Sequence, residues 1–456
     1  MSIVANEERS AHGGAEKACR RALVVGLGKT GIAVARALGD EGVPVRVTDK
    51  AEDAALRDGL GDVEWVSDHD PDALLADVDL VVPSPGVPAA NAVLVRAQER
   101  GIPVRSEIEL AALRLAAPMV AVTGTNGKST TTELIAHILG GPDAGVFAGG
   151  NLGTPLIRAV GQRPNVAVVE VSSFQLEWVE TFHPRIGLFL NVTDDHLDRH
   201  GDIDAYAALK ARLFARQDEG DTAILNRDDP RVARLAGSLR ARVATFGAGP
   251  LEADGAVADE ERVEMRLGGR RGSYPLGRCR LLGAHNRENV MAAILAAAAM
   301  GATDDQIVSG IESFEALPHR MQLVHERGGV RFVDDSKGTN VGALVRSIGG
   351  WPDGRVVLVA GGLAKGGDFT QARELLTRKA RAVVLYGAAR EALSRSWHGA
   401  APLLVHERFD DAVRAAARAA QPGDVVLLSP ACASFDQFEN FAKRGDAFAQ
   451  AVRTLA

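Results

Sequence analysis

The sequence is short of cysteine, of long apolar runs and of net positive charge, and each shortage excludes a class of protein. Its 456 residues include 3 cysteines, Cys19, Cys279 and Cys432, which lie far apart. This number and spacing predict neither a disulfide framework nor a zinc site, and they fit a reducing compartment. No apolar run is long enough to span a bilayer. Residues 1–20 are polar and lack the apolar centre of a signal peptide, so we interpret them as a disordered tail.

The charge balance argues against a general nucleic-acid-binding protein. The chain has 52 Lys and Arg residues against 59 Asp and Glu residues, a formal net charge of -7, whereas nucleic-acid binding normally relies on a basic surface. Nucleotides are not excluded, because a few local donors and Mg2+ neutralise phosphate whatever the global charge. The length predicts about three domains of roughly 150 residues each.

The stretch PMVAVTGTNGKSTTTE, residues 118–133, organises the rest of the chain. Its apolar start predicts a buried strand, and from Ser129 onward apolar residues recur on one face of a predicted helix. The glycine loop between them points backbone N–H groups and a helix N-terminus at an anion. Lys128 adds a charge for the outer phosphates, and the hydroxyl of Ser129 or Thr130 can hold Mg2+. The spacing is not that of a standard Walker A motif, but it favours a nucleoside-triphosphate site over an ordinary glycine turn.

A second glycine loop, GLGKTG, occupies residues 26–31 after a predicted strand over residues 21–25. An Ala-rich helix and another strand lead from it to Asp49 and Lys50. This is the arrangement of a dinucleotide-binding turn with an acidic residue about 20 positions on. Because a helix N-terminus binds any diphosphate, the loop alone does not distinguish NAD from another ligand.

Acidic and histidine residues follow two predicted strands of the middle segment. Glu170 comes directly after residues 166–169, and His196 lies in an acidic loop after residues 186–190. The carboxyl ends of parallel strands form the ligand edge of an open α/β sheet. Glu170 therefore suits Mg2+, with a cap for the next helix as the alternative, and the acids beside His196 favour a functional role.

Two further features of the middle segment are ambiguous when taken alone. Lys210 lies on a predicted helix over residues 204–214, where a lysine is most often solvated. Asn286 and Asn289 precede an Ala-rich predicted helix over residues 290–300. Their amides suit a base or a ribose, but such residues also cap helices.

The last third of the chain repeats the pattern of a strand followed by a polar loop. A connector with a helix-breaking proline is predicted over residues 310–320. Predicted strands follow at residues 330–333, 356–360, 382–385 and 425–428. Each ends in a small, polar or charged loop, which is the pattern of a doubly wound sheet.

Nine loops occur in one order along nearly all of the chain after the tail. They are TGTNGKST, GGNLG, EVSSFQLE, NVTDDHLDRHG, HNRENV, LPHRM, DDSKGTN, GGLAKGGDF and SPACASFDQFENFAKRG. This order closely resembles the Mur ligases. EVSSFQLE and SPACASFDQF favour the members that use glutamate, whereas TGTNGKST and HNRENV are shared with relatives that include the folylpolyglutamate synthases.

The resemblance implies an α/β protein of three domains, each built on a mostly parallel sheet with flanking helices. A Rossmann-like UDP-sugar-binding domain is expected over residues 21–117, a P-loop-like central ATP-binding domain over residues 118–317, and a Rossmann-like amino-acid-binding domain over residues 318–456. The implied activity is an ATP-dependent ligase that adds D-glutamate to UDP-N-acetylmuramoyl-L-alanine through an acyl phosphate, in cytoplasmic peptidoglycan precursor synthesis. It implies two Mg2+ sites, a monomer, and neither nucleic acid nor membrane as partner.

The resemblance also implies roles for individual residues. The catalytic residues are Lys128, His196 and Lys210, and the metal ligands are Ser129, Glu170, His196 and Lys210, with Lys210 carrying a CO2-derived carbamate. The ATP contacts are Gly124, Thr125, Asn126, Gly127, Lys128, Ser129, Thr130, Asn286, Asn289, Arg320 and Asp335. The UDP-sugar contacts are Gly28, Lys29, Thr30, Asp49, Lys50, Ser84, Asn151 and His196. The amino-acid contacts are Thr339, Lys365, Ser434, Phe435 and Phe441.

Three alternatives stand beside this interpretation. The GLGKTG loop alone suggests an NAD-dependent oxidoreductase. A different Mur ligase, or a ligase like folylpolyglutamate synthase, would share the same ATP-binding segment. A non-catalytic, nucleotide-gated binding protein is disfavoured by the set Lys128, Glu170, His196 and Lys210. The residues by themselves leave the hand of the glutamate open.

Overall fold

The computed structural model describes residues 19–49, 60, 63–66, 70–151, 153–194, 197–281, 283–315, 317–364 and 368–454. Residues 1–18 of the predicted tail and the predicted site residues Lys50, His196 and Lys365 lie outside these ranges. The described chain forms three sheets, of four, nine and six strands. This confirms the predicted architecture of three α/β parts with mostly parallel sheets. No helix among the described residues is long and apolar enough to cross a membrane.

The chain divides into two compact units. One contains residues 1–117, 149–164 and 171–183, and the other contains residues 118–148, 165–170 and 184–456. The first unit therefore joins the four-stranded sheet to two later segments of chain. The second unit contains the six-stranded sheet and most of the nine-stranded sheet.

The first sheet has four parallel strands in the order β3-β2-β1-β4. The strands are β1 (Ala22–Val25), β2 (Val45–Thr48), β3 (Glu64–Trp65) and β4 (Leu80–Pro83), and the helices are α1 (Lys29–Asp40), α3 (Pro71–Leu74), α4 (Ala92–Glu99) and α5 (Glu107–Ala112). Every residue of β1, β2 and β4 is buried, as in a parallel sheet covered on both faces. The strand predicted over residues 21–25 is confirmed to within one residue.

Two buried acids of α5 hold the later segments of the first unit, which carry α7 (Ile157–Gln162) and α8 (Ser173–Leu176). An oxygen of Glu107 accepts a hydrogen bond from the Ile157 backbone N at 2.6 Å. Glu109 accepts from the backbone N of Thr181 at 2.7 Å. Burial raises the pKa of Glu107 to about 7, against the opposing effect of the Ile157 hydrogen bond. Glu107 therefore changes its charge near neutral pH.

The second sheet has nine strands in the order β13-β12-β11-β10-β9-β8-β5-β7-β6. They are β5 (Met119–Thr123), β6 (Val146–Gly150), β7 (Val166–Glu170), β8 (Ile186–Phe189), β9 (Thr222–Asn226), β10 (Arg242–Phe246), β11 (Gly255–Ala258), β12 (Arg262–Leu267) and β13 (Arg270–Pro275). β5 pairs in parallel with β7 and β8, whereas β12 pairs antiparallel with β11 and β13. No pattern used in the sequence analysis predicts β10 to β13. β12 buries only alternate residues and leaves the charged ones between them exposed or half-buried, so it lacks the continuous apolar run of β5, β7 and β8.

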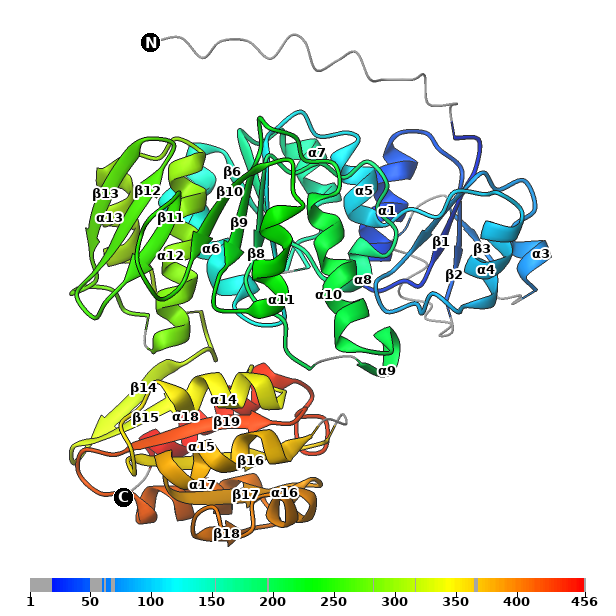
Figure 1. Cartoon of the computed structure of the whole chain (residues 1–456). Helices are drawn as coiled ribbons and strands as arrows, with labels where there is room; N and C mark the ends of the chain where they lie inside the picture. Colours follow the sequence, from blue (N-terminus) through cyan, green and yellow to red (C-terminus); the bar gives the residue numbers. More distant parts are fainter. Residues whose placement is uncertain are drawn as a thin grey trace. The chain divides into compact units, whose positions relative to one another are not determined.

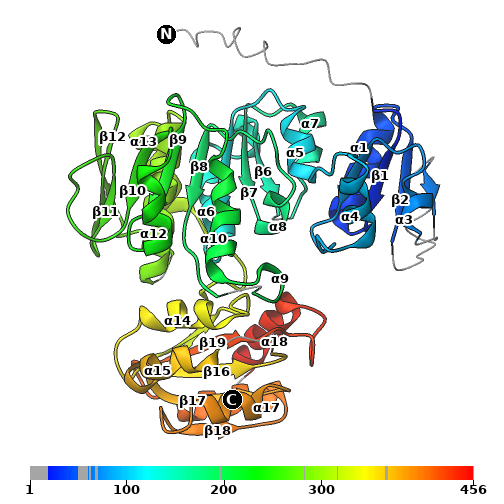
Figure 2. The same ribbon diagram turned by 45° about the vertical axis from the view of Figure 1, so that its right-hand side comes forward.

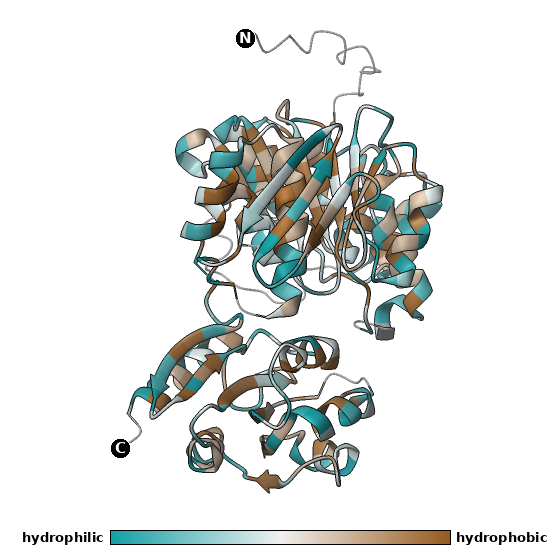
Figure 3. Cartoon of the chain, turned by 60° about the vertical axis from the view of Figure 1, so that its left-hand side comes forward, coloured by the Kyte–Doolittle hydropathy of each residue, from teal (hydrophilic) through white to brown (hydrophobic). Residues whose placement is uncertain are grey.

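The helices of the middle segment are α6 (Lys128–Ile138), α9 (Leu197–His200), α10 (Ile203–Ala211), α11 (Pro230–Ala233), α12 (Ala284–Ala299) and α13 (Asp304–Ser313), with short 3-10 turns η2 (Pro142–Ala144), η3 (Arg212–Phe214) and η4 (Arg234–Gly237). α6 and α12 pack side by side (Figure 1) and share one apolar core with β5, β7, β8 and β9. Many helices in Figure 3 carry both apolar and polar stretches, as expected when one face is buried.

Two predicted boundaries in this segment are wrong. The helix predicted over residues 290–300 begins at Ala284, so Asn286 and Asn289 lie within it and not before it. The connector predicted from residue 310 begins later, because α13 continues to Ser313. A reciprocal capping pair, Thr303 and Gln306, starts α13 upstream of the predicted connector.

The third sheet has the order β14-β15-β19-β16-β17-β18, with β14 antiparallel and the others parallel. Its strands are β14 (Gln322–Arg327), β15 (Val330–Asp334), β16 (Val356–Gly361), β17 (Ala380–Tyr386), β18 (Leu403–Val405) and β19 (Val425–Ala431), and its helical segments are α14 (Val341–Gly349), η5 (Phe369–Ala372), α15 (Arg373–Lys379), α16 (Arg390–Ser396), α17 (Phe409–Ala419) and α18 (Phe441–Arg453). Val356 and Leu358 pack in a core with α14, α15 and α16, whereas Val357 and Val359 pack in a core with α17 and α18. This alternation gives the sheet two covered faces, as Figures 1 and 2 show.

Candidate active site

The predicted phosphate loop lies between β5 and α6, as the sequence indicates. Gly127 is the N-cap of α6 and has a left-handed φ of 85°, and Gly124 has a φ of 151°. A side chain at Gly127 would collide with Oδ1 of Asn289. Both glycines therefore permit a backbone path that other residues rarely adopt, and the loop brings its N–H groups to the helix N-terminus.

The loop is braced by the next strand end along the sheet. Asn191, which follows β8, accepts from the backbone N of Asn126 at 2.9 Å and donates to its carbonyl oxygen at 3.0 Å. The Thr125 backbone N donates to the Asn191 carbonyl oxygen at 2.9 Å. The Thr193 backbone N donates to Oγ1 of Thr125 at 3.0 Å. These bonds fix the loop before any ligand arrives, which is the preorganisation that phosphate binding needs.

Ser129, Glu170 and Arg320 meet at the start of α6. The Ser129 hydroxyl donates to Oε2 of Glu170 at 2.5 Å and accepts from Nη2 of Arg320 at 2.6 Å. Glu170 is buried, and its charge adds to burial in raising the pKa of Glu133. Hydroxyl and carboxylate oxygens are the ligands that Mg2+ prefers. The pair Ser129 and Glu170 therefore fits a magnesium ion beside the phosphate loop.

Two lysine side chains end at the same carbonyl group. Nζ of Lys128 donates to the carbonyl oxygens of Gly124 and Thr125, each at 2.9 Å. Nζ of Lys210 donates to the Gly124 carbonyl oxygen at 3.0 Å and lies 4.5 Å from the centre of the Tyr206 ring. Lys210 is only 1% exposed. The prediction from the helix pattern alone, that a lysine here is solvated, is wrong.

A small cavity of about 80 Å³ adjoins the loop within the second unit. Its lining brings together seven of the predicted ATP contacts, which are Asn126, Gly127, Thr130, Asn286, Asn289, Arg320 and Asp335. The side chain of Asn289 donates to Oδ1 of Asn286 at 3.0 Å, and both residues are buried. Two buried amides that orient each other are suited to reading a base by hydrogen bonds.

Three ionisable groups that line this cavity have shifted pKa values. Burial raises the pKa of Asp335 to about 7, although hydroxyls of Ser347 and Ser429 donate to it. Burial lowers the pKa of Arg320, against the opposing charges of Glu170 and Asp335. Burial lowers the pKa of His285 to about 4, so this ring is neutral at physiological pH. The cavity therefore combines the cations Arg320, Lys337 and Arg346 with a neutral His285 ring.

The predicted UDP-sugar edge lies in the first unit. A cavity of about 710 Å³ is lined there by Gly28, Lys29, Thr30, Asp49 and Ser84, together with apolar residues such as Val87 and Pro88. Asp49 accepts from the Leu27 backbone N at 2.5 Å. The Ser84 hydroxyl donates to the Gly26 carbonyl oxygen at 2.7 Å. These two bonds fix the backbone of the glycine loop at the edge of the cavity.

The remaining predicted contacts lie in other loops. Asn151 is exposed and follows β6 in the first unit. Thr339 follows β15, Ser434 and Phe435 follow β19, and Phe441 begins α18. Ser434 is 3% exposed, whereas Phe435 is 67% exposed. An apolar ring with this exposure is available for a contact with a ligand or a closing segment.

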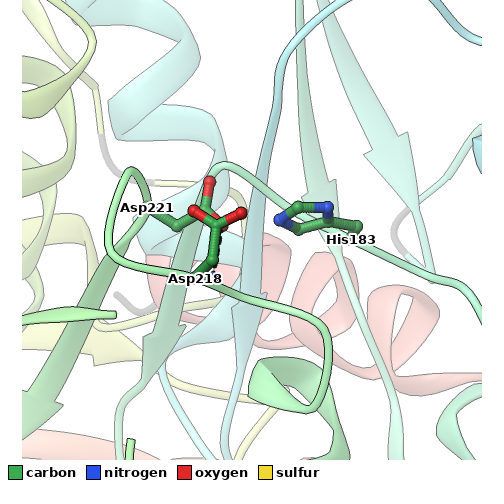
Figure 4. Close-up of side chains that lie close together, drawn as sticks. All are labelled: His183, Asp218 and Asp221. Atoms are coloured by element: carbon green, nitrogen blue, oxygen red, sulfur yellow. Dashed lines mark hydrogen bonds between the residues drawn. The ribbon is translucent and has the colours of Figure 1, made fainter. Parts of the chain in front are cut away.

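One polar cluster was not predicted from the sequence. The carboxylates of Asp218 and Asp221, both in the second unit, lie close together (Figure 4). The two acids are engaged in the turn before β9, where the Asp218 backbone N donates to Asp221 at 2.8 Å and the Gly220 backbone N donates to Asp218 at 2.8 Å. These contacts give the acids a structural role, and we assign no metal to them.

Several supporting residues were also missed. Asn191 and Thr193 brace the phosphate loop, and Arg346 pairs with Glu288 of α12 at 2.7 Å. Asn191 and Thr193 belong to the polar loop after β8, so the rule that ligand-edge loops are functional points to them. The pair between Arg346 and Glu288 has no such signal, because 58 residues separate its partners.

Three protein-family profiles match successive parts of the chain. Residues 20–106 match the profile described as Mur ligase MurD-like, N-terminal domain. Residues 122–297 match the Mur ligase middle domain, and residues 319–432 match the Mur ligase, glutamate ligase domain.

Curated relatives match over the full length. The UDP-N-acetylmuramoylalanine–D-glutamate ligase of Syntrophus aciditrophicus (strain SB) is 45% identical over 448 residues, which cover 96% of this chain and 98% of that protein. The enzyme of the same name from Geobacter metallireducens is 42% identical over 440 residues, which cover 95% of this chain and 97% of that protein.

Solved structures share the fold at lower identity. A pseudomurein peptide ligase type C from Methanothermus fervidus superposes with a TM-score of 0.61 at 20% identity, over 95% of this chain and all of that one. The UDP-N-acetylmuramate-alanine ligase MurC from Thermotoga maritima superposes with a TM-score of 0.56 at 20% identity, over 95% of this chain and 99% of that one.

Proposed function

From the premise that this chain belongs to the Mur ligase family, we propose that it joins D-glutamate to UDP-N-acetylmuramoyl-L-alanine at the expense of ATP. The observation that carries the proposal is a full-length match to such ligases in a chain whose phosphate loop, acid and paired amides lie together. The product is an amide-linked precursor of peptidoglycan.

The reaction has two chemical steps. A carboxylate is a poor electrophile because an oxide ion would have to leave, so the alanyl carboxylate first takes the γ-phosphoryl group of ATP and becomes an acyl phosphate. The amine of glutamate then attacks the acyl carbon, and inorganic phosphate leaves the tetrahedral intermediate. Such catalysis consists mainly of positioning and charge neutralisation.

The phosphate loop and Lys128 act on the triphosphate. The loop N–H groups and the α6 N-terminus stabilise the β-phosphate, and Lys128 exchanges the carbonyl oxygens of Gly124 and Thr125 for phosphate oxygens. Arg320, whose guanidinium already reaches Ser129, adds a second cation for the charge that develops on the transferred group.

Ser129 and Glu170 would hold one Mg2+, and Lys210 with His196 a second. Bound Mg2+ supplies positive charge for the β- and γ-phosphates. The side chain of Lys210 is buried against a carbonyl oxygen that also accepts from Lys128. Addition of CO2 to Lys210 removes the repulsion between the two ammonium groups and supplies an anionic ligand. We include this carbamate in the proposal.

The nucleoside is held next to α12. Asn286 and Asn289 contact the adenine through their buried amides, and Asp335 faces the same cavity. A ribose hydroxyl is a suitable partner for Asp335, because a carboxyl group with a pKa of about 7 can donate or accept a hydrogen bond.

The two other substrates use the loops of the outer sheets. The UDP group binds in the cavity of the first unit, where the α1 N-terminus with Lys29 and Thr30 faces the diphosphate, and Lys50 completes this set. Asn151 contacts the muramoyl-alanine part. The amino acid is held by Thr339, Lys365, Ser434, Phe435 and Phe441, since a cation and hydroxyls pair with two carboxylates.

The protein acts in the cytoplasm as a monomer, within this proposal. Its substrates ATP and a UDP-sugar are cytoplasmic, and none of its three cysteines forms a disulfide, as in a reducing compartment.

Phosphate release from ATP tests the proposal. Purified protein, Mg2+ and UDP-N-acetylmuramoyl-L-alanine are incubated with each amino acid of either hand. We expect rapid release with D-glutamate and at least tenfold less with L-glutamate. Phosphate release that requires a different amino acid would contradict the proposal. So would phosphate release that occurs only when NAD is added. Omission of the UDP-sugar serves as the control for uncoupled hydrolysis.

A further inference from the structure

Arg444 is a fully buried cation in the first turn of α18. Its exposed fraction is 0%, although arginine is rarely buried without a charged partner. The residue belongs to the segment ENFAKRG, residues 439–445, in which the proposed contacts give a role to Phe441 alone. Such a buried charge costs free energy unless other groups compensate it.

The guanidinium of Arg444 links three strand-end loops of the six-stranded sheet. It donates to the Ser336 hydroxyl at 2.9 Å and to the Ser336 carbonyl oxygen at 2.8 Å, in the loop after β15. It donates to the Cys432 carbonyl oxygen at 3.1 Å, after β19. It also donates to the Tyr386 hydroxyl at 3.3 Å, at the end of β17. One side chain therefore ties together loops that are up to 96 positions apart in the sequence, from residue 336 to residue 432.

All of these partners are neutral. Among the described residues, no carboxylate lies within ion-pair distance of Arg444, in contrast to Arg381, which pairs with Asp424 in the same domain. Four hydrogen bonds to neutral groups, without an ion pair among the described residues, hold the guanidinium of Arg444 in place. A fixed charge of this kind favours an anionic ligand nearby.

The loops that Arg444 holds carry the proposed amino-acid contacts. Thr339 lies three residues after Ser336, and Ser434 lies two residues after Cys432. The two loops also bond to each other, since the Ala431 backbone N donates to the Gly338 carbonyl oxygen at 2.9 Å. Arg444 thus donates hydrogen bonds to both of the loops that carry Thr339 and Ser434.

We infer that Arg444 is the positioning residue of the glutamate subsite. Its planar fork sets the spacing between the loops after β15 and β19, and its positive charge favours a ligand with two carboxylates. Lysine would keep the charge but lose the fork, because its ammonium is a single point donor on a flexible stem. This inference rests on the proposed function and adds a residue that need not touch the substrate.

The test compares Arg444→Lys with wild type in two measurements. One is KM for D-glutamate at saturating ATP and UDP-N-acetylmuramoyl-L-alanine. The other is acyl-phosphate formation in the absence of glutamate. It is measured as the scrambling of 18O from the β–γ bridge of ATP into the other oxygens of the β-phosphate. We expect KM to rise at least tenfold and scrambling to stay within twofold of wild type. The exposed neighbour Lys443, changed to Ala, is the matched control and leaves both unchanged.

A second variant covers the case in which Arg444→Lys does not fold. Ser336→Ala removes the hydroxyl that accepts from Arg444 and donates to the Phe441 carbonyl oxygen, and it should raise KM for glutamate about threefold with scrambling unchanged. An unchanged KM in a folded Arg444→Lys protein, or a parallel loss of scrambling and glutamate use, would overturn the inference. Failure of the proposed function itself is distinct, because wild type would then show no scrambling.

Discussion

The glycine loops after β1 and after β5 share a sequence pattern but differ in the backbone conformation of the glycine that caps the next helix. Each connects a buried parallel strand to a helix whose first residue is a lysine, Lys29 in one and Lys128 in the other. In the first loop the N-cap Gly28 has an ordinary φ of -64°, whereas in the second the N-cap Gly127 is left-handed. The shared pattern of strand, glycine loop and helix therefore predicts an anion-binding site in both cases, but it does not predict which anion binds.

The difference lies in the groups behind each loop. The loop after β5 is backed by Glu170 and Arg320, which both contact Ser129. The loop after β1 is backed by Asp49, whose carboxylate accepts from the loop backbone at Leu27. Glu170 lies beside a hydroxyl at the helix N-terminus, where the two can share a metal with a triphosphate, whereas Asp49 holds the backbone of its own loop. This comparison explains why we assign a metal-dependent phosphoryl transfer to one loop and simple diphosphate binding to the other.

Exchange of the two lysines for alanine should give the largest contrast. Lys128→Ala should lower kcat about 1000-fold, because a charge that stabilises the transferred phosphoryl group is lost. Lys29→Ala is the matched variant, and it should leave kcat within twofold while KM for the UDP-sugar rises about tenfold, the loss of one charge-assisted contact. Steady-state phosphate release measures both. Equal losses of kcat in the two variants would break the comparison.

Neutralisation of the two acids should give the next effect. Glu170→Gln should reduce kcat about 100-fold and raise the Mg2+ concentration needed for half-maximal rate, since a charged ligand is lost. Asp49→Asn should leave the Mg2+ dependence as it is and change only KM for the UDP-sugar. Magnesium titrations of the two variants decide the point, and a shifted midpoint in Asp49→Asn would contradict the assignment.

Alanine in place of the two N-cap glycines tests the backbone difference. Gly127→Ala should lower the free energy of unfolding by about 1–2 kcal/mol, because a left-handed residue gains a Cβ and Asn289 is displaced. Gly28→Ala should change it by less than about 0.5 kcal/mol, since no atom lies within 4 Å of the added Cβ. Urea titration is the measurement, and equal losses would show that the two caps do not differ.

The smallest effect on turnover is expected from Glu107, a buried acid that serves the fold of the first unit. Burial raises the pKa of Glu107 from the ordinary glutamate value of 4.5 to about 7 in the folded protein. The folded state therefore keeps a proton that the unfolded state releases, and stability falls by up to about 3 kcal/mol as pH rises from 4.5 to 7. Glu107→Gln should flatten this part of the profile. Urea titrations at pH 5 and pH 7.5 test it, and an unchanged pH profile in the variant would contradict the burial effect.

The sequence was most informative where apolar runs end in polar loops. The strands at β5, β7, β15 and β16 and the placing of Glu170 at a strand end follow from local pattern alone. The charged antiparallel strands β12 and β13 do not, because their pattern is that of a half-exposed strand and not of a buried one.

Long-range contacts are the part of the site that local pattern does not reveal. Arg320 reaches Ser129 across 191 residues, and Arg444 reaches Ser336 across 108. The resemblance predicts a nucleotide role for Arg320 but not its partner. Lys210 was predicted from the resemblance alone, since helical periodicity favours an exposed lysine while tertiary packing buries it.

The central claim is that the loop after β5 directs the γ-phosphoryl group of ATP to a carboxylate. UDP-N-acetylmuramoyl-L-alanine labelled with 18O in the alanyl carboxylate tests it most directly, because the carboxylate oxygen must leave with the phosphoryl group. The account predicts one 18O atom in each inorganic phosphate released when both carboxylate oxygens are labelled. Inorganic phosphate without 18O during amide formation would contradict it.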